Sequence, residues 1–201
     1  MDKDKLYNQL IENVKKDDYD KNFIILFLGN IGSGKSTYSK RLSDDLQLYV
    51  AKNEEIRELV NGNRIDNNKN IELVHELSNY RINYLLKNNI SFIYDADATR
   101  RLSDIIDLAG KYSYELFLIW LDCPDDILMQ RRLKRDVKDG VDPTESIRII
   151  NENNESYKKL RESIDINDKV DIKIDTTKDF EKNISIIEET FNSMFNQKNL
   201  K

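Results

Sequence analysis

The chain has 201 residues, of which 34% are charged, and a formal net charge of −5. Its length suits one domain with a sizeable core, and no apolar run is long enough to cross a membrane. A single cysteine excludes an internal disulfide, and the polar N-terminus lacks a signal-peptide core, so we expect a cytoplasmic protein. The negative charge argues against broad coating of nucleic acid without excluding a local basic groove.

The hydrophobic pattern predicts strands that alternate with helices. We expect strands at 23–28, 48–51, 91–94, 115–122 and 170–175. We expect helices at 4–16, 38–46, 54–60, 68–89, 102–112, 124–135, 144–163 and 180–195, with a polar, charged segment at 136–142. Such alternation implies right-handed crossovers and a parallel sheet with helices on both faces, which is an α/β fold.

The first expected strand runs directly into a glycine-rich loop. Residues 29–36 read GNIGSGKS, which fills the pattern G-x-x-x-x-G-K-[ST] between a strand and a helix. Glycines let backbone amides surround a phosphate, Lys35 can reach the β- and γ-phosphates, and the Ser36 hydroxyl can ligate Mg²⁺. The alternative is a glycine turn that only joins the two elements. The predicted nucleotide-binding residues are Gly29, Asn30, Ile31, Gly32, Ser33, Gly34, Lys35, Ser36 and Thr37.

Two charged residues follow the second expected strand. Glu54 and Arg57 are three residues apart, so they share one face of the helix that opens there. A carboxylate at this point can accept the proton of an attacking hydroxyl, and Arg57 can hold an anionic substrate group. The alternative is that the acidic residues here only favour a helix N-terminus.

Charged residues also follow the third expected strand. Asp95 stands where a carboxylate that positions the metal follows a buried strand, and Asp97 competes for that role because strand ends are uncertain. We favour Asp95, since an apolar run leads directly into it. Asp97, Arg100 and Arg101 are then expected on the substrate side, the alternative for the two arginines being surface charge at the start of a helix.

A basic run at 130–135 precedes the charged segment 136–142. Arg131 and Arg135 are four residues apart and share a helix face. Paired arginines beside such a segment are typical of a mobile lid that closes on the transferring phosphoryl group. The alternative is a solvated cationic helix end, because helix C-termini favour Lys and Arg.

Together these motifs resemble a P-loop phosphotransferase of the polynucleotide-kinase-like branch, which includes the kinase domain of phage polynucleotide kinase and the seryl-tRNA kinases. The resemblance covers about residues 23–177 and rests on GNIGSGKST, NEEIR, FIYDADATRR, QRRLKRDVKDGVDP and DIKIDTT, in the order of the family. It implies a P-loop nucleoside triphosphate hydrolase fold with a five-stranded parallel sheet and a small helical lid. It also implies ATP and Mg²⁺ as ligands, with the adenine bordered by Asp175, Thr176 and Thr177.

For catalysis, the resemblance places Glu54 where the family has an aspartate base and Arg57 where it has an acceptor-binding arginine. Arg131 and Arg135 match the lid arginines. We therefore expect one P-loop kinase domain over 1–201, with a helical extension at 1–21 and a lid at about 131–143. The expected reaction moves the γ-phosphoryl group to a hydroxyl.

The acceptor stays open at this level. A polynucleotide 5′-hydroxyl or an RNA-linked group is the first expectation, and a small-molecule, nucleoside or nucleotide kinase is the second. The substitution of Glu54 for the usual aspartate and the short loop after Asp95 both bear on this acceptor side. A non-catalytic nucleotide-binding regulatory protein is the rival from another class. The sequence does not specify the oligomeric state.

Overall fold

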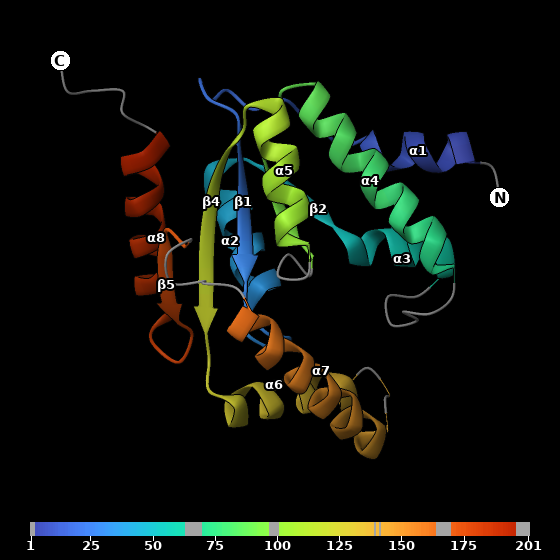
Figure 1. The fold of residues 1–201 in the computed structure, drawn as a ribbon, viewed down its shortest axis with the longest axis vertical. Helices are drawn as coiled ribbons and strands as arrows, with labels where there is room; N and C mark the ends of the chain where they lie inside the picture. Colours follow the sequence, from blue (N-terminus) through green and yellow to red (C-terminus); the bar gives the residue numbers. More distant parts are fainter. Residues whose placement is uncertain are drawn as a thin grey trace. The chain divides into compact units, whose positions relative to one another are not determined.

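The computed structural model describes residues 3–62, 70–96, 101–138, 140, 142–163 and 170–195. Helices and strands alternate along the chain (Figure 1). The strands are β1 (Phe23–Leu28), β2 (Tyr49–Lys52), β3 (Phe92–Asp95), β4 (Glu115–Asp122) and β5 (Ile172–Asp175). The helices are α1 (Lys3–Ile11), α2 (Lys35–Leu46), α3 (Asn53–Asn61), α4 (Ile71–Lys87), α5 (Leu102–Tyr112), α6 (Asp125–Lys138), α7 (Pro143–Ser163) and α8 (Phe180–Phe195).

The five strands form one sheet in the order β2-β3-β1-β4-β5. β3 pairs in parallel with both β1 and β2, and β4 pairs in parallel with β5. Every residue of β1 is buried, as expected for a strand that other layers cover on both faces. The predicted five-stranded parallel α/β fold is therefore confirmed.

Several element boundaries differ from the sequence-based expectation, and for two of them, in α1 and α6, the structure gives the physical reason. α1 ends at Ile11 and does not reach residue 16. The segment after α1 is held by hydrogen bonds to a side chain instead of by helical ones, because the Asp17 carboxylate accepts hydrogen bonds from the amides of Tyr19 (3.1 Å) and Ser91 (2.6 Å). α6 continues to Lys138, so the start of the segment expected to be a polar loop is helical. Asp136 in that last turn is buried and ion-paired, which favours the longer helix.

By its internal packing the chain divides into two compact units. One consists of Met1–Leu26 and Ser39–Leu116, and the other of Phe27–Tyr38 and Phe117–Lys201. The phosphate loop and the lid segment belong to the second unit, whereas Glu54, Arg57 and Asp95 belong to the first. The single kinase domain stays a prediction.

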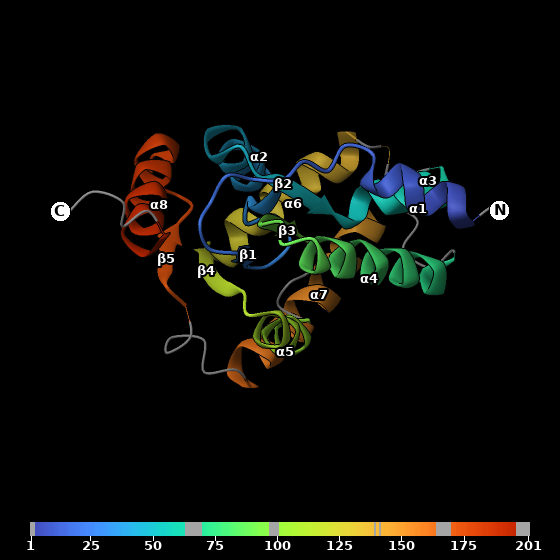
Figure 2. The same ribbon diagram turned by 90° about the horizontal axis from the view of Figure 1, so that it is seen from above.

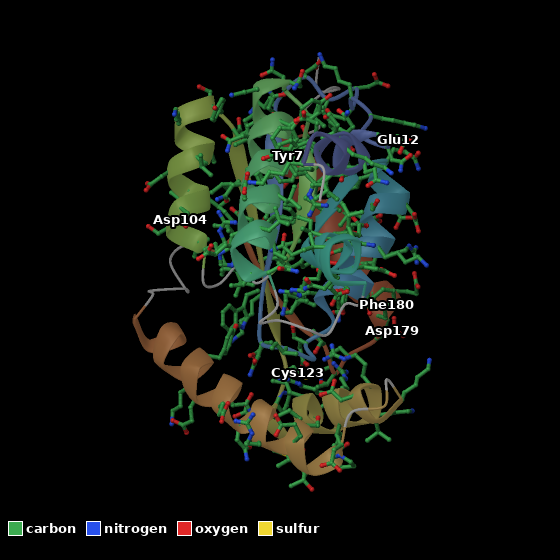
Figure 3. All side chains as sticks on the ribbon, turned by 90° about the vertical axis from the view of Figure 1, so that its right-hand side faces the viewer. Tyr7, Glu12, Asp104, Cys123, Asp179 and Phe180 are labelled. Atoms are coloured by element: carbon green, nitrogen blue, oxygen red, sulfur yellow. The ribbon has the colours of Figure 1, made fainter. Side chains whose placement is uncertain are left out.

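In the first unit, α1, α3 and α4 share an apolar core (Figure 2). The buried residues of this cluster are Leu6, Leu10, Ile56, Val60, Val74 and Leu77. Tyr7 of α1 faces α4 (Figure 3), where its ring stacks on Tyr80 with a centroid distance of 4.1 Å. The helix that precedes the first strand thus packs against α4 and shares an apolar core with α3, the helix that carries Glu54 and Arg57.

In the second unit, α8 covers β4 through aromatic contacts. Phe117 of β4 meets Phe191 and Phe195 of α8 with centroid distances of 5.8 and 6.1 Å. α6 and α7 form a hairpin of two helices packed side by side (Figure 1). Among the described residues, no helix is long and apolar enough to cross a membrane.

Candidate nucleotide and acceptor sites

The phosphate loop of the second unit has a backbone that requires glycine at two positions. Gly29 has a φ of 149°, and a Cβ there would lie 2.8 Å from the Ser33 Oγ and 2.9 Å from the Leu121 carbonyl oxygen. Gly32 has a φ of 93°, and its Cβ would lie 3.0 Å from the Leu128 carbonyl oxygen. Any larger residue would force the loop open, so the glycines set its tight curvature.

Lys35 folds back over this loop at the start of α2. Its Nζ donates hydrogen bonds to the carbonyl oxygens of Gly29 (2.7 Å) and Asn30 (3.0 Å). The amides of Thr37 and Tyr38 donate to the Gly34 carbonyl at 2.9 and 3.1 Å, which starts the helix directly after the loop. A cationic amine above a glycine loop at a helix N-terminus forms an anion site.

The loop residues fit a nucleotide phosphate and its magnesium ion. The Ser33 Oγ is fully buried and has no hydrogen-bond partner in the part of the chain that the structure describes. Ser36 lies exposed in the first turn of α2 and offers a hydroxyl oxygen, and Asp95 ends β3 as a buried carboxylate. Both are oxygen donors of the kind that Mg²⁺ prefers. The assignment of Ser36 and Asp95 to the metal stays a prediction.

The structure brings together the residues expected beside the adenine. Arg131 of α6 donates from Nη2 to the Thr176 carbonyl oxygen (2.9 Å) and from Nη1 to the Thr176 Oγ1 (3.2 Å). The Asp175 carboxylate accepts hydrogen bonds from the Thr177 hydroxyl (2.6 Å) and amide (2.9 Å), and these bonds lower the pKa of Asp175. One corner of the second unit therefore holds Arg131, Asp175, Thr176 and Thr177.

The two arginines expected in the lid have different partners. Whereas Arg131 contacts Thr176, Arg135 donates from Nε (3.2 Å) and Nη2 (3.0 Å) to Asp136 Oδ1. Asp136 Oδ2 also accepts hydrogen bonds from Ser146 Oγ of α7 (2.6 Å) and Arg132 Nε (3.3 Å). Asp136 thus joins the two helices of the hairpin.

The pKa of Asp136 reflects this environment. Burial by itself would raise the pKa, but the hydrogen bonds from Ser146 and Arg135, with the charges of Arg135 and Arg132, outweigh it and lower the pKa. Burial lowers the pKa of Arg132, against the opposing effect of Asp136. The cluster therefore holds an ionised carboxylate inside the hairpin.

In the first unit, the polar residues at the start of α3 differ in their contacts with α4. Glu55 accepts a hydrogen bond from Arg81 Nη1 of α4 (3.2 Å), and the Asn53 Oδ1 accepts one from Ser78 Oγ (3.0 Å). Arg81 is only 1% exposed. Glu54 and Glu55 are both exposed and Arg57 is half-buried, so what sets Glu55 apart from Glu54 is its ion pair with Arg81.

The remaining acceptor-side expectations have mixed outcomes. Asp97 and Arg100 lie outside the described residues. Arg101 donates from Nη2 to the Asn79 Oδ1 of α4 at 2.8 Å and lies 3.9 Å from Asp104 of α5, which Figure 3 labels. In the structure Arg101 therefore links two helices, and its role in substrate binding stays a prediction.

A family model described as an AAA domain, AAA_33, matches residues 24–159. The chain belongs to this family. Its phosphate loop and sheet are thus those of a P-loop domain, and the narrower polynucleotide-kinase-like branch stays a prediction. A search of curated proteins finds no significant match.

Solved structures of kinases share the fold of this family member. A putative kinase from Chloroflexus aurantiacus aligns with a TM-score of 0.56 and 16% identity, over 86% of this chain and 97% of the other. Shikimate kinase from Aquifex aeolicus aligns with a TM-score of 0.53 and 17% identity, over 86% of this chain and 98% of the other. The APS kinase of Mycobacterium tuberculosis, in complex with AMPPNP and APS, aligns with a TM-score of 0.55 and 14% identity, over 86% of this chain and 98% of the other. At these identities the likeness shows the fold.

Three residues of this AAA-domain chain lie in notable contacts that the sequence analysis did not select. They are Arg81, Asp136 and Asn154, the last of which binds the phosphate-loop residue Asn30 at 2.6 Å. For Arg81 a sequence signal existed, because it continues the apolar positions Leu77 and Leu85 at a spacing of four. Asp136 follows Arg132 at the same spacing.

Proposed function

We propose that the chain is an ATP-dependent kinase that transfers the γ-phosphoryl group to a hydroxyl of a small molecule. The observation that carries this proposal is the phosphate loop, in which Lys35 lies over the carbonyls of Gly29 and Asn30. The contact of Arg131 with Thr176 supports it, because it places a cation at the predicted base end in the same unit.

On the donor side, this chain binds and orients the triphosphate. Lys35 exchanges its two carbonyl contacts for the β- and γ-phosphate oxygens, and the amides of the loop hold the β-phosphate. Ser36 would hold Mg²⁺, which when bound neutralises the charge of the phosphate oxygens. Positioning and charge neutralisation supply most of the catalysis in such transfers.

On the acceptor side, Glu54 takes the proton of the attacking hydroxyl. The acceptor O–H bond breaks, the oxygen bonds to the γ-phosphorus, and the bond to the bridging oxygen breaks to release ADP. The exposed Glu54 carboxylate is available for this, since the buried Arg81 pairs with Glu55. Arg57, one turn along α3, would hold an anionic group of the acceptor.

Charge favours a small acceptor over a polynucleotide. In the basic run of α6, Arg132 and Arg135 are both paired with Asp136, whose single negative charge offsets part of their positive charge within the hairpin. The net charge of −5 gives no general attraction for a phosphate backbone. The shikimate and APS kinases that share the fold support the same choice.

The test is phosphate transfer from γ-labelled ATP to a panel of sugars, nucleosides, nucleotides and an oligonucleotide with a 5′-hydroxyl. We expect one of the small molecules to become labelled. The rate of this transfer should fall by about 10²-fold or more in Lys35→Ala and in Glu54→Gln. The control is Glu58→Gln, at an exposed position of α3, which should keep full activity.

Transfer that survives Lys35→Ala would contradict the proposal. Labelling of the oligonucleotide alone would replace the small acceptor with the polynucleotide. ATP binding without transfer to any acceptor would favour the non-catalytic regulatory protein.

A further inference from the structure

One face of α7 is in contact with the rest of the second unit between Ser146 and Tyr157. Ser146 binds Asp136 of α6, Ile150 is 2% exposed, and Tyr157 packs on Trp120 of β4 with a centroid distance of 5.9 Å. Asn154 lies between Ile150 and Tyr157 at helical spacing on this same face. A polar side chain on an inward face needs a hydrogen-bond partner.

The partner of Asn154 lies in the phosphate loop. The Asn30 Nδ2 donates a hydrogen bond to the Asn154 Oδ1 at 2.6 Å, across 124 residues of sequence. The Asn30 Oδ1 accepts one from the Ile31 amide at 2.7 Å, so both polar ends of this side chain are engaged. Asn30 is 7% exposed, which leaves little room for other partners.

The main chain of Asn30 holds the rest of the loop. Its carbonyl oxygen accepts hydrogen bonds from Lys35 Nζ (3.0 Å) and from the Ser33 amide (3.1 Å). The orientation of Asn30 therefore fixes the turn at Ile31, the amide of Ser33 and the resting place of Lys35. The motif leaves residue 30 free to be any amino acid, so the motif by itself does not require this arrangement.

We propose that Asn154 is a positioning residue of the nucleotide site: through the side chain of Asn30 it holds the phosphate loop in its binding shape. This inference rests on the nucleotide-binding half of the proposed function. Without Asn154, the buried Asn30 Nδ2 loses its partner and the side chain rotates away from Ile31. The loop then has to be ordered when the phosphates bind, which weakens binding.

The experiment measures the dissociation constants of MgATP, MgADP and adenosine by calorimetry. Asn154→Ala should weaken the binding of MgATP and MgADP by about three- to tenfold, which corresponds to the net free energy of one hydrogen bond. The affinity for adenosine should be unchanged. The control is Asn151→Ala, an exposed residue one turn earlier on α7. Asn30→Ala should weaken the binding of the same two ligands. The double variant should bind them no more weakly than Asn30→Ala does, since both substitutions act through one contact.

Three results would overturn the inference: wild-type affinity in Asn154→Ala, fully additive losses in the double variant, or an equal loss for adenosine, which has no phosphate. Thermal unfolding of each variant checks that it is folded, and Asn30→Ala tests the contact from the loop side. Because binding is measured without an acceptor, a protein that transfers no phosphate can still show the Asn154 effect. Failure of the proposed kinase activity is thereby distinguished from failure of this inference.

Discussion

Asp136 shows how one carboxylate can determine the geometry of a helical hairpin. Its two oxygens accept hydrogen bonds from Arg132, Arg135 and Ser146, of which the first two lie on α6 and the third on α7. Arg132 and Asp136 are both 8% exposed, so their charges are largely removed from water. A buried pair of this kind is costly to break, because the remaining charge has no compensation.

Asp136→Asn should lower the free energy of unfolding by about 3 kcal/mol at pH 7, because it leaves Arg132 as a buried cation. The wild type should also lose stability in acid. The pKa of Asp136 is lowered in the folded chain, so its contribution is present above the unfolded pKa of about 4 and is lost as pH falls through the folded value.

Urea unfolding at pH 7, 4 and 3 measures both effects. The difference in the free energy of unfolding between wild type and Asp136→Asn should shrink as pH falls below about 4. Asp107→Asn, at an exposed position of α5, is the control. An unchanged difference at pH 3 would show that the carboxylate charge does not contribute.

At the scale of elements, α1 serves as a support for α3. Leu6 and Leu10 lie in the same cluster as Ile56 and Val60 of α3, so the helix of Glu54 is packed from the N-terminal side of the chain. The surface of α1 also makes polar contacts, since Lys3 and Tyr7 both bind the Glu76 carboxylate of α4. Loss of the apolar contact should therefore loosen α3 as well as α1.

Leu10→Ala should cost about 2–3 kcal/mol of stability, since it leaves a cavity in this cluster. Hydrogen exchange of the amides in α3 should become faster, while that of α8 in the other unit should be unchanged under native conditions. The measurement is urea unfolding together with mass-spectrometric hydrogen exchange. Gln9→Ala, on the exposed face of α1, should behave as wild type. Equal exchange of α3 in both variants would show that α1 does not support it.

For the whole molecule, charge predicts how the acceptor binds. The net charge is −5, and the carboxylate of Asp136 reduces the positive charge of the two arginines of α6 that are paired with it. The KM for a small acceptor should change by less than about twofold between 50 and 200 mM salt, since no phosphate backbone has to release counterions. Steady-state kinetics at several salt concentrations measure this. A KM that rises by orders of magnitude would indicate a polynucleotide acceptor.

Much of the architecture could be predicted from the sequence. The expected ranges 102–112, 115–122 and 180–195 coincide with α5, β4 and α8, because apolar periodicity and unbroken apolar runs mark these elements clearly. The phosphate loop was found from its motif, and the structure gives it glycine backbone angles and a lysine over its carbonyls. The roles of these residues in catalysis stay predictions.

The missed features depend on contacts between distant residues. Asn154 looks like any polar residue of an exposed helix until the fold brings it to Asn30. The helical state of Asp136 is set by partners on two helices, and local composition favoured a loop there. A sequence pattern describes one element at a time, so it does not predict contacts between side chains of distant elements.

The contact of Trp120 with α7 has a spectroscopic consequence. Trp120 is the only tryptophan of the chain, it is 3% exposed in β4, and it packs against Tyr157, one turn beyond Asn154. Light absorbed by this indole alone therefore yields an emission that reports on the inward face of α7. The protein thus carries its own optical probe, and a change in the packing of α7 on β4 can be followed by fluorescence without attaching a dye.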